Sequence, residues 1–394
     1  MRVYLDNSAT TALDNDALKA MMPYFSDKFG NPSSLHQFGR EALQAVDESR
    51  AKIASLIGAK PNEIYFTSGG SESDNWALKG TVYASKAKNK HIVTTAIEHP
   101  AILETCEYLE KKDGVKVSYV PSGKDGRVTL DAVKAAVTDD TLLVSVMFAN
   151  NETGAIQPIK EIGEFCHEQG ILFHTDAVQA MDSQAIDVNE LHIDMLSMSA
   201  HKFHGPKGIG VLYIRSGIKI DRLIAGGHQE RRMRAGTTDT PLIVGMAKAL
   251  EIAVQNREEN NRRVAALRDN FVDRVLKEIP YAYLNGGREH RLPGNANFSF
   301  GFIEGESILI NLDLNGIAVS SGSACSSGSL EPSHVILALG VPEELAHSSI
   351  RFSLGRDTTA EQMDYTFNVL KDTVEKLRSI SPLFDSEKGT GSYV

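Results

Sequence analysis

Short apolar runs alternate with stretches of helical periodicity through the first part of the chain. The runs are rich in β-branched and aromatic residues and lie between residues 63 and 214. Such alternation is typical of βαβ units and predicts a large α/β domain with a mostly parallel sheet covered by helices. We expect seven strands, at EIYFT, HIVTTA, VKVSYV, TLLVSVMF, ILFHTD, MLSMSA and GVLYI.

The pattern changes after residue 240. A long helical stretch from Pro241 to about Ile279 leads into shorter strand-like runs, ANFSF, IAVSS and SIRFS, that lie between helices. This pattern predicts a smaller α+β domain. The last residues, SPLFDSEKGTGSYV, have little periodicity and predict a mobile tail. The expected divisions are an N-terminal segment that joins the small domain (1–15), the large domain (16–260), the small domain (261–379) and the tail (380–394).

Composition and charge exclude several classes of function. The formal net charge of −10 gives no general attraction for nucleic acid, so direct binding of DNA or RNA is not expected. No apolar run is long enough to span a bilayer, and the N-terminal MRVYLDNSATT does not resemble a secretion signal. We therefore expect a cytoplasmic globular protein that does not contact a membrane.

The three cysteines are far apart in sequence and indicate neither a disulfide framework nor a zinc site. Cys106 and Cys166 lie in helix-like patterns and are expected to be small buried residues. Cys325 lies in the run SSGSACSSGSL, within an expected loop at residues 320–331. So much glycine and serine predicts a mobile, exposed segment, and a free thiol on such a segment indicates sulfur chemistry that requires movement. The alternative is an accidental surface cysteine.

One lysine stands in an unusual place. Lys202 follows the apolar run MLSMSA, between His201 and His204. Burial of an ammonium group is costly unless the group is paired or neutralised, and an amine with a lowered pKa can form an imine. The alternative is an ordinary loop lysine that reaches solvent. The two histidines have no third ligand at metal spacing, so no metal site is predicted.

The segment Thr67–Ser73, TSGGSES, combines two glycines with four hydroxyl side chains at a strand-to-helix turn. Free backbone N–H groups and hydroxyls at the start of a helix predict a phosphate cradle. The segment matches neither the nucleoside-triphosphate motif nor the dinucleotide motif. The alternative is an ordinary capped helix with Ser71 as the N-cap.

Three further polar residues are candidates for the same site. Asp176 ends the run ILFHT and could keep a ring nitrogen protonated, whereas a helix cap is the ordinary role of such a residue. His99 could stack on a ring or transfer protons, or it could be structural. Arg351 interrupts the apolar run SIRFS, so it either binds a substrate carboxylate or forms an internal ion pair.

A lysine, an aspartate, a histidine, a phosphate cradle and an arginine together are what pyridoxal phosphate requires. The sequence resembles the fold-type I pyridoxal-phosphate enzymes related to class-V aminotransferases, and within them the cysteine desulfurases of the NifS/IscS branch. The resemblance extends over about residues 3–375. Its motifs are YLDNSATT, GNPSSLHQFGR, FTSGGSESDN, EHPA, NNETGAIQPI, HTDAVQ, SAHKFHGPKGIG, RAGT, SSGSACSSGSLEPSHV and HSSIRFSLGR.

The resemblance implies a role for each matching residue. Lys202 would hold pyridoxal 5'-phosphate as an imine, with His99 stacked on the ring and active in proton transfer. Cys325 would attack the sulfur of L-cysteine and become a persulfide, so that alanine leaves. Arg351, with Asn31, would bind the substrate carboxylate. The implied cofactor ligands are Gly70, Ser71, His99, Asn151, Asp176, Gln179, Ser199, His201, Lys202 and, from the partner subunit of a homodimer, Thr237.

The resemblance also implies partners. Sulfur would pass to an iron–sulfur scaffold protein of the IscU/NifU type, or to an acceptor in tRNA thiolation or nitrogenase assembly. Cys325 could in addition ligate a transferred iron–sulfur cluster. One alternative is a selenocysteine lyase or another pyridoxal-phosphate-dependent aminotransferase or lyase, which would not need a mobile cysteine. A second alternative is a non-catalytic subunit that binds a partner, which the intact set of site residues disfavours.

Overall fold

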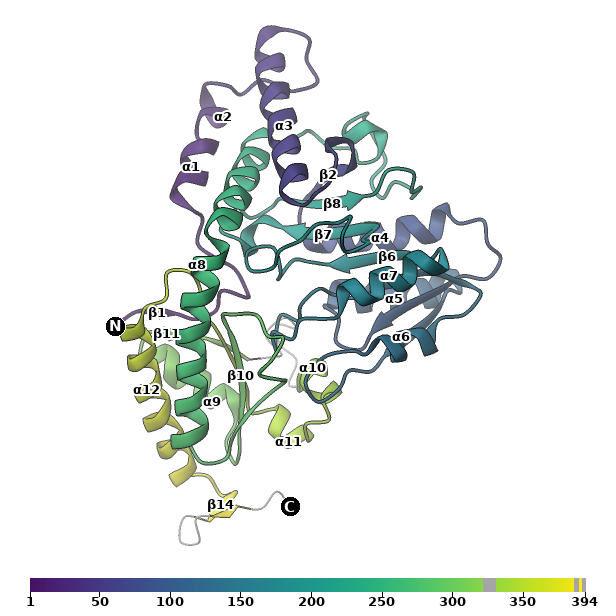
Figure 1. Ribbon diagram of the computed structural model, residues 1–394. Helices are drawn as coiled ribbons and strands as arrows, with labels where there is room; N and C mark the ends of the chain where they lie inside the picture. Colours follow the sequence, from purple (N-terminus) through teal and green to yellow (C-terminus); the bar gives the residue numbers. More distant parts are fainter. Residues whose placement is uncertain (322–330, 386–389, 392–394) are drawn as a thin grey trace.

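The structure, a computed structural model, describes residues 1–321, 331–385 and 390–391 (Figure 1). Its large sheet has seven strands in the order β2-β8-β7-β6-β5-β3-β4. The strand β8 is antiparallel to both of its neighbours, whereas the other pairs are parallel. Each strand lies within one of the apolar runs named above. The strands are β2 (Ile64–Thr67), β3 (His91–Thr95), β4 (Lys116–Val120), β5 (Thr141–Ser145), β6 (Leu172–Asp176), β7 (Met195–Ser199) and β8 (Gly210–Ile214).

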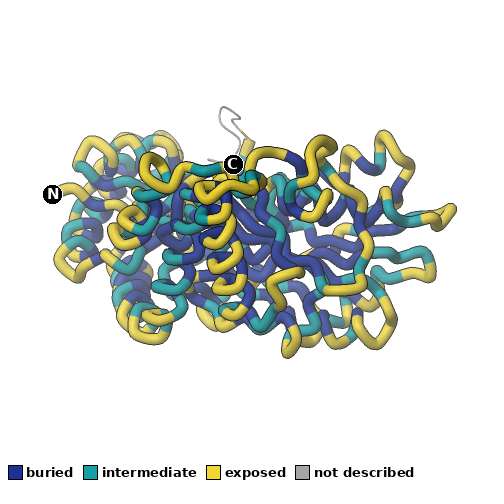
Figure 2. Tube along the Cα trace, turned by 90° about the horizontal axis from the view of Figure 1, so that it is seen from above, coloured by how far each residue is buried: buried dark blue, intermediate teal, exposed yellow. Residues whose placement is uncertain are grey.

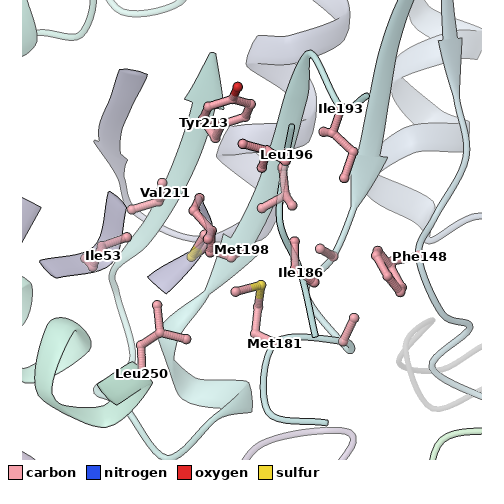
Figure 3. Close-up of a cluster of buried hydrophobic side chains, with 14 of the residues drawn as sticks. Ile53, Phe148, Met181, Ile186, Ile193, Leu196, Met198, Val211, Tyr213 and Leu250 are labelled. Atoms are coloured by element: carbon pink, nitrogen blue, oxygen red, sulfur yellow. The ribbon is translucent and has the colours of Figure 1, made fainter. Parts of the chain in front are cut away.

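Helices cover both faces of this sheet because successive residues of a strand point to opposite sides. On β7, Met195 belongs to a buried cluster with residues of α4 and α5, whereas Leu196 belongs to a cluster with α3, α7 and α8. Figure 3 shows part of this second cluster, in which Met198 and Val211 from the sheet lie near Leu250 of α8. The helices are α3 (Gln37–Leu56), α4 (Gly70–Ala84), α5 (Pro100–Asp113), α6 (Leu130–Ala136), α7 (Ile159–Gln169) and α8 (Thr240–Glu278).

The small domain is built around β10 (Asn295–Phe300), in an antiparallel sheet of order β12-β13-β10-β9. The helix α8 crosses the expected boundary at 260/261 without a break. Up to Ala253 it belongs to the core of the large domain, and from Val264 onward to that of the small domain. The buried segments run through the interior of both parts (Figure 2). The remaining elements are β1 (Val3–Tyr4), β9 (Ala282–Leu284), α9 (Gly305–Leu314), β11 (Ile317–Ala318), β12 (Ser320–Ser321), α10 (His334–Ala338), α11 (Glu343–Ala346), β13 (Ser349–Ser353) and α12 (Ala360–Ser379).

The first residues of the chain connect the two domains. The strand β1 pairs with β11, and Asp6 forms a bridge with Ser353 of β13. Further along, the Thr11 N–H group donates to the carbonyl oxygen of His201 at 3.0 Å. This segment therefore reaches from the small domain to the turn that carries Lys202. Two short helices follow it, α1 (Asn15–Met21) and α2 (Pro23–Ser26).

The end of the chain has regular structure that its periodicity does not reveal. In the described part of the tail, β14 (Phe384–Asp385) pairs antiparallel with β15 (Thr390–Gly391), and the predicted mobility of the tail stays a prediction. The ring centroid of Phe384 lies 6.1 Å from that of Tyr281 and 5.7 Å from that of Phe302. Aromatic packing against the small domain, which periodicity does not reveal, holds the start of the tail.

Part of the expected loop at residues 320–331 lies outside the described residues. Ser320 and Ser321 pair with β13, whereas residues 322–330, which include Cys325, are not described. Within the described ranges, no helix has both the length and the apolar character needed to cross a membrane.

A buried ion pair covers the free edge of the large sheet at β2. The guanidinium group of Arg50 on α3 donates two hydrogen bonds to Glu230, at 2.7 and 2.8 Å. The same two side chains satisfy backbone groups of the edge strand, because Glu230 accepts from the Phe66 N–H group and Arg50 donates to the Ile64 carbonyl. Their side chains are only 6% and 10% exposed. The pair therefore fixes α3 to an edge that would otherwise expose unpaired backbone groups.

We expect Glu230→Ala to lower the free energy of unfolding by about 3–5 kcal/mol, because it leaves the Arg50 charge buried without a partner. The fluorescence of Trp76, which is buried in the large domain, follows this unfolding in denaturant. The control is Glu251→Ala. It removes an ion pair to Lys52, a half-exposed residue of α3, and should lower the free energy of unfolding by about 1 kcal/mol or less. Equal losses in the two variants would contradict the role of the buried pair.

Candidate active site

A cavity of about 300 Å³ lies at the carboxyl ends of the strands of the large sheet. Ligands bind at this edge of open α/β sheets, and the volume is at the lower end of the range for ligand pockets. Ten of the residues that the sequence predicts for the site line the cavity. They are Gly70, Ser71, His99, Asn151, Asp176, Gln179, Ser199, His201, Lys202 and Arg351.

Lys202 lies in a single turn of 3-10 helix, Ala200–Lys202, directly after β7. This agrees with the sequence analysis, in which the lysine follows the apolar run MLSMSA. Its Nζ atom donates hydrogen bonds to the carbonyl oxygens of Ser8 at 2.5 Å and Ala9 at 2.8 Å. The N-terminal segment thus fixes the amine at the cavity wall. The sequence gives no sign of these partners, because they act through the backbone.

The start of α4 forms one end of the cavity. The helix begins at Gly70, and the N-cap residue Gly69 makes no side-chain cap hydrogen bond. Ser71 therefore lies within the first turn, so the alternative reading in which it caps the helix is wrong. The first N–H groups of a helix have no intrahelical partners and attract anions. A side chain at position 70 would collide with Val178, so only glycine lets the backbone lie this close.

One side chain from the end of β7 and one from the turn that follows it complete this end. Ser199 is the last residue of β7, and Nδ1 of His201 lies 3.1 Å from the hydroxyl oxygen of Thr10. Burial, followed by the nearby Lys202 charge, lowers the pKa of His201 to about 4, so its ring is neutral. If Nδ1 accepts the Thr10 proton, Nε2 carries a hydrogen that can be donated to an anion.

Asp176, at the end of β6, also lines the cavity. Its side chain is nearly buried, and Oδ1 accepts a hydrogen bond from the Val178 N–H group at 2.9 Å. Burial raises the pKa of Asp176, while the charges of His99 and Lys202 act in the opposite direction. A cationic ring nitrogen would favour the ionised form of this carboxyl group. The side-chain amide of Gln179 donates a hydrogen bond to the Ser8 carbonyl at 2.9 Å. The N-terminal segment that holds Lys202 therefore also holds Gln179.

His99 combines the two roles that the sequence leaves open. It is the N-cap residue of α5, and its Nδ1 atom accepts a hydrogen bond from the Ala101 N–H group at 3.1 Å. It also lines the cavity. Because Nδ1 is an acceptor, the neutral ring carries its proton on Nε2. Burial lowers the pKa of His99, which favours this neutral form.

Arg351 on β13 also combines both of its expected roles. It is 3% exposed, and its Nη2 atom lies 2.8 Å from Oδ1 of Asp6. Nη1 donates to the carbonyl oxygen of Asn151 at 3.1 Å, and Nε has no hydrogen-bond partner among the described residues. The internal ion pair is therefore present, and it holds the guanidinium group in the cavity wall. Asp6 is a site residue that the sequence analysis missed, although it lies in the motif YLDNSATT.

Two described residues that the resemblance implies for the site, Asn31 and Thr237, do not line this cavity. Asn31 lies in the connection between α2 and α3, far from the small domain (Figure 1), and its Oδ1 atom accepts from the Ser33 N–H group at 2.9 Å. The role of Asn31 in binding the substrate carboxylate therefore stays a prediction. Thr237 is exposed and does not line the cavity. Cys325 lies outside the described residues.

A model of the aminotransferase class-V family matches residues 3–366 of the sequence. The chain belongs to this family. A relative named cysteine desulfurase IscS, from Clostridium botulinum (strain Kyoto / Type A2), is 53% identical over 386 residues, which are 98% of this chain and 97% of the relative.

Solved structures agree with this assignment. The structure of a NifS-like protein is 40% identical, has a TM-score of 0.90, and covers 96% of this chain and 100% of its own. The structure of SspA in complex with cysteine is 36% identical, with a TM-score of 0.80 and coverage of 91% and 100%.

These comparisons confirm the predicted fold and the prediction of a pyridoxal-phosphate-dependent cysteine desulfurase of the NifS/IscS branch. The residues of the cavity fit this cofactor. The N-terminus of α4 with Ser71, together with Ser199 and the neutral ring of His201, suits the phosphate group, and the buried carboxyl group of Asp176 suits the ring nitrogen. Lys202 supplies an amine in the same cavity.

Glu98, next to His99, is fully buried and was not singled out by the sequence analysis. Its Oε1 atom accepts from the Thr95 hydroxyl at 2.7 Å and from the Met147 N–H group at 2.9 Å, while Oε2 has no partner among the described residues. Burial raises the pKa of Glu98 to about 8. In the folded protein at neutral pH, the Glu98 side chain is therefore mostly the protonated, neutral acid.

This shift predicts a pH dependence of stability. Between the ordinary glutamate pKa of 4.5 and about 8, the unfolded chain loses the proton that the folded chain retains at Glu98. Stability is therefore lost as pH rises through this range, by about 1.4 kcal/mol per pH unit. Glu98→Gln removes this loss, so its advantage over wild type should grow by roughly 2–3 kcal/mol from pH 5 to pH 7 in denaturant titrations.

Glu48→Gln is the matched control, because Glu48 is an exposed glutamate on α3. Its stability relative to wild type should be the same at the two pH values. If the stability of Glu98→Gln also stays parallel to that of wild type, Glu98 does not retain its proton in the folded protein.

Proposed function

We propose that this chain converts L-cysteine to L-alanine and takes up the sulfur as a persulfide on Cys325. One observation carries the proposal: a single cavity joins the amine of Lys202, the carboxyl group of Asp176 and the guanidinium group of Arg351. The related SspA structure in complex with cysteine supports cysteine as the substrate. Cysteine chemistry also accounts for a thiol in the glycine- and serine-rich segment around Cys325.

Bound pyridoxal phosphate supplies an electron sink for the bonds to the substrate α-carbon. Lys202 Nζ is the attachment point for the cofactor and, once released, the base that takes the α-proton. Its hydrogen bonds to the Ser8 and Ala9 carbonyls orient the amine for both tasks. Asp176 would keep the ring nitrogen of the bound cofactor protonated, and His99, with its proton on Nε2, would serve as a stacking and proton-transfer group.

Arg351 binds the substrate carboxylate. A guanidinium group has five N–H donors, of which the Asp6 carboxylate and the Asn151 carbonyl each take one. The remaining donors suit a bidentate contact with a carboxylate. Asp6 orients the arginine and lowers the cost of its burial.

Cys325 acts as the thiolate that attacks the substrate sulfur. The S–S bond forms as the C–S bond of the substrate breaks, and the carbon fragment leaves as alanine after protonation. The persulfide sulfur then passes to a partner, for which we propose an iron–sulfur scaffold protein of the IscU/NifU type. Transfer to another acceptor, ligation of an iron–sulfur cluster by Cys325 and the cytoplasmic location stay predictions.

The central test is Cys325→Ser. This variant should bind the cofactor with unchanged absorbance, but alanine formation from cysteine should fall by about a hundredfold or more because the nucleophile is lost. Cys166→Ala is the matched control and should keep its activity, since burial raises the pKa of this thiol to about 12. Lys202→Ala should lose both the covalently held cofactor and activity. Full turnover by Cys325→Ser would exclude the persulfide role.

We further propose that the active form is a homodimer. Apolar side chains are exposed around the connection between α2 and α3, where Phe29, Leu35 and Phe38 are 66%, 91% and 52% exposed. A contiguous apolar surface of this kind marks a protein interface. The same connection and Thr238 line one hollow, so the exposed Thr237 lies at this surface. A second copy over this surface would bring Thr237, and Asn31, toward the partner's cavity.

The double variant Leu35→Asp with Phe38→Asp should raise the dimer dissociation constant by about tenfold or more, because it buries charge in an apolar interface. Sedimentation velocity measures the association, and cofactor absorbance should fall with it if Thr237 serves the partner. The control is Leu314→Asp at the end of α9, which is a leucine with 78% exposure in the small domain. An unchanged dimer in the double variant would place the interface elsewhere.

A further inference from the structure

One face of the small-domain sheet is polar and nevertheless buried. Successive residues of β10 and β13 point to opposite faces, and one face, with Phe298 and Phe352, belongs to the apolar core of the small domain. Burial of the polar face is costly unless its groups are hydrogen-bonded. Its members are each at most 3% exposed, and they are Asn295, Asn297, Ser299, Ser349, Arg351 and Ser353.

The two asparagines of this face bind the large domain. The side-chain amides of Asn295 and Asn297 donate hydrogen bonds to the carbonyl oxygen of Glu152, at 3.0 and 3.1 Å. Arg351, the register partner of Asn297, donates to the preceding carbonyl, that of Asn151. Two adjacent strands of the small sheet therefore bind two consecutive carbonyls of the turn at residues 151–153, and this turn carries Asn151 into the cavity wall.

Buried neighbours hold both amides in this orientation. Oδ1 of Asn295 accepts a hydrogen bond from Nη1 of Arg291 at 3.1 Å, and Oδ1 of Asn297 accepts from the Asn285 amide at 2.8 Å. Because a guanidinium group only donates, the oxygen of Asn295 must face Arg291 and its nitrogen must face Glu152. Arg291 also donates to the backbone carbonyl of Asn285, so it supports both asparagines.

The backbones of the two domains also meet closely at this point. The Leu292 N–H group donates to the carbonyl of Gly154 at 2.8 Å, and the Ile156 N–H group donates to the carbonyl of His290 at 2.7 Å. Gly154 has a φ of +74°, and a Cβ atom there would lie 2.6 Å from that of Asn295. The start of β10 is therefore held directly against the large domain.

These contacts bear on the position of Arg351. Its own hydrogen bonds, to Asp6 and Asn151, orient the guanidinium group. The bonds from Asn295 and Asn297 hold the neighbouring strand, so a shift of β10 away from the turn would carry β13 with it. A bidentate contact with a carboxylate depends on the exact placement of the guanidinium fork, so such a shift would weaken it.

We propose that Asn297 and Asn295 are positioning residues for the substrate carboxylate, because they hold the sheet that carries Arg351 against the turn that carries Asn151. The proposal rests on the proposed function, in which Arg351 binds that carboxylate. Loss of either amide donor then weakens the binding of cysteine, whereas the cofactor and the steps that follow binding are little affected.

The test is the effect of Asn297→Ala and, separately, of Asn295→Ala on the kinetics of alanine formation from cysteine. Each variant removes one donor to Glu152 and should raise KM about tenfold, while kcat stays within about twofold. The dissociation constant of pyridoxal phosphate and the absorbance of the bound cofactor should also stay at the wild-type values. The inhibition constant of 3-mercaptopropionate, which has the carboxylate and the thiol of cysteine but no amine, should rise by the same factor as KM.

A double-mutant cycle shows whether the asparagine acts through the arginine. Arg351→Ala alone should raise KM, and the addition of Asn297→Ala should raise it no further, because the group that Asn297 positions is already absent. Asn311→Ala is the matched control. Asn311 is a half-buried residue of α9 whose amide donates to the Ser307 carbonyl of the same helix at 2.8 Å, so its loss should leave KM unchanged.

Three outcomes would overturn the proposal. A wild-type KM in both asparagine variants, together with a raised KM in Arg351→Ala, would remove the positioning role and leave the proposed function intact. Similar losses in kcat, KM and cofactor affinity would show that the asparagines only stabilise the fold. An unchanged KM in Arg351→Ala would mean that this arginine does not bind the substrate carboxylate, and the role of the asparagines would be refuted with it.

Discussion

The hydrogen bonds from Lys202 to the carbonyl oxygens of Ser8 and Ala9 join the two domains at the centre of the site. The segment that supplies these carbonyls begins in the small domain, where β1 pairs with β11, and two residues before Ser8 it carries Asp6. Asp6 in turn pairs with Arg351. One short stretch of chain therefore sets the amine and the arginine relative to each other, although they come from different domains. Any displacement of this segment would move both groups at once.

The second constraint on the site is that most of its titratable side chains are neutral. Burial favours the neutral forms of Glu98, His201 and Asp74. In such surroundings the interactions of the remaining charges are strong, because little water screens them. The ionised groups at the cavity are then those that can each be paired with a charge of the cofactor or the substrate. Asp176 and Arg351 are the two residues with that role.

The sequence predicts the large sheet and most of the cavity for one reason. Polar residues that follow buried strands, such as Asp176 and Lys202, must meet at the carboxyl edge of a parallel sheet. The antiparallel direction of β8 does not follow from periodicity, which carries no information on strand order. Asp74, which lines the cavity, was missed because an acid inside an amphipathic helix is ordinarily a surface residue. The place of Asn31 stays open because membership of a motif does not say which copy of the chain the residue serves.

The structural and the functional readings of single residues turn out to be compatible. The cap hydrogen bond from the Ala101 N–H group to His99 fixes which ring nitrogen carries the proton. The bond from the Val178 N–H group to Asp176 stabilises the carboxylate that a cationic ring nitrogen needs. The ion pair with Asp6 likewise holds Arg351 in one orientation while leaving donors for a second carboxylate. In each case the structural contact supplies the orientation on which the chemistry depends. A structural contact at one of these residues is therefore no argument against its functional role.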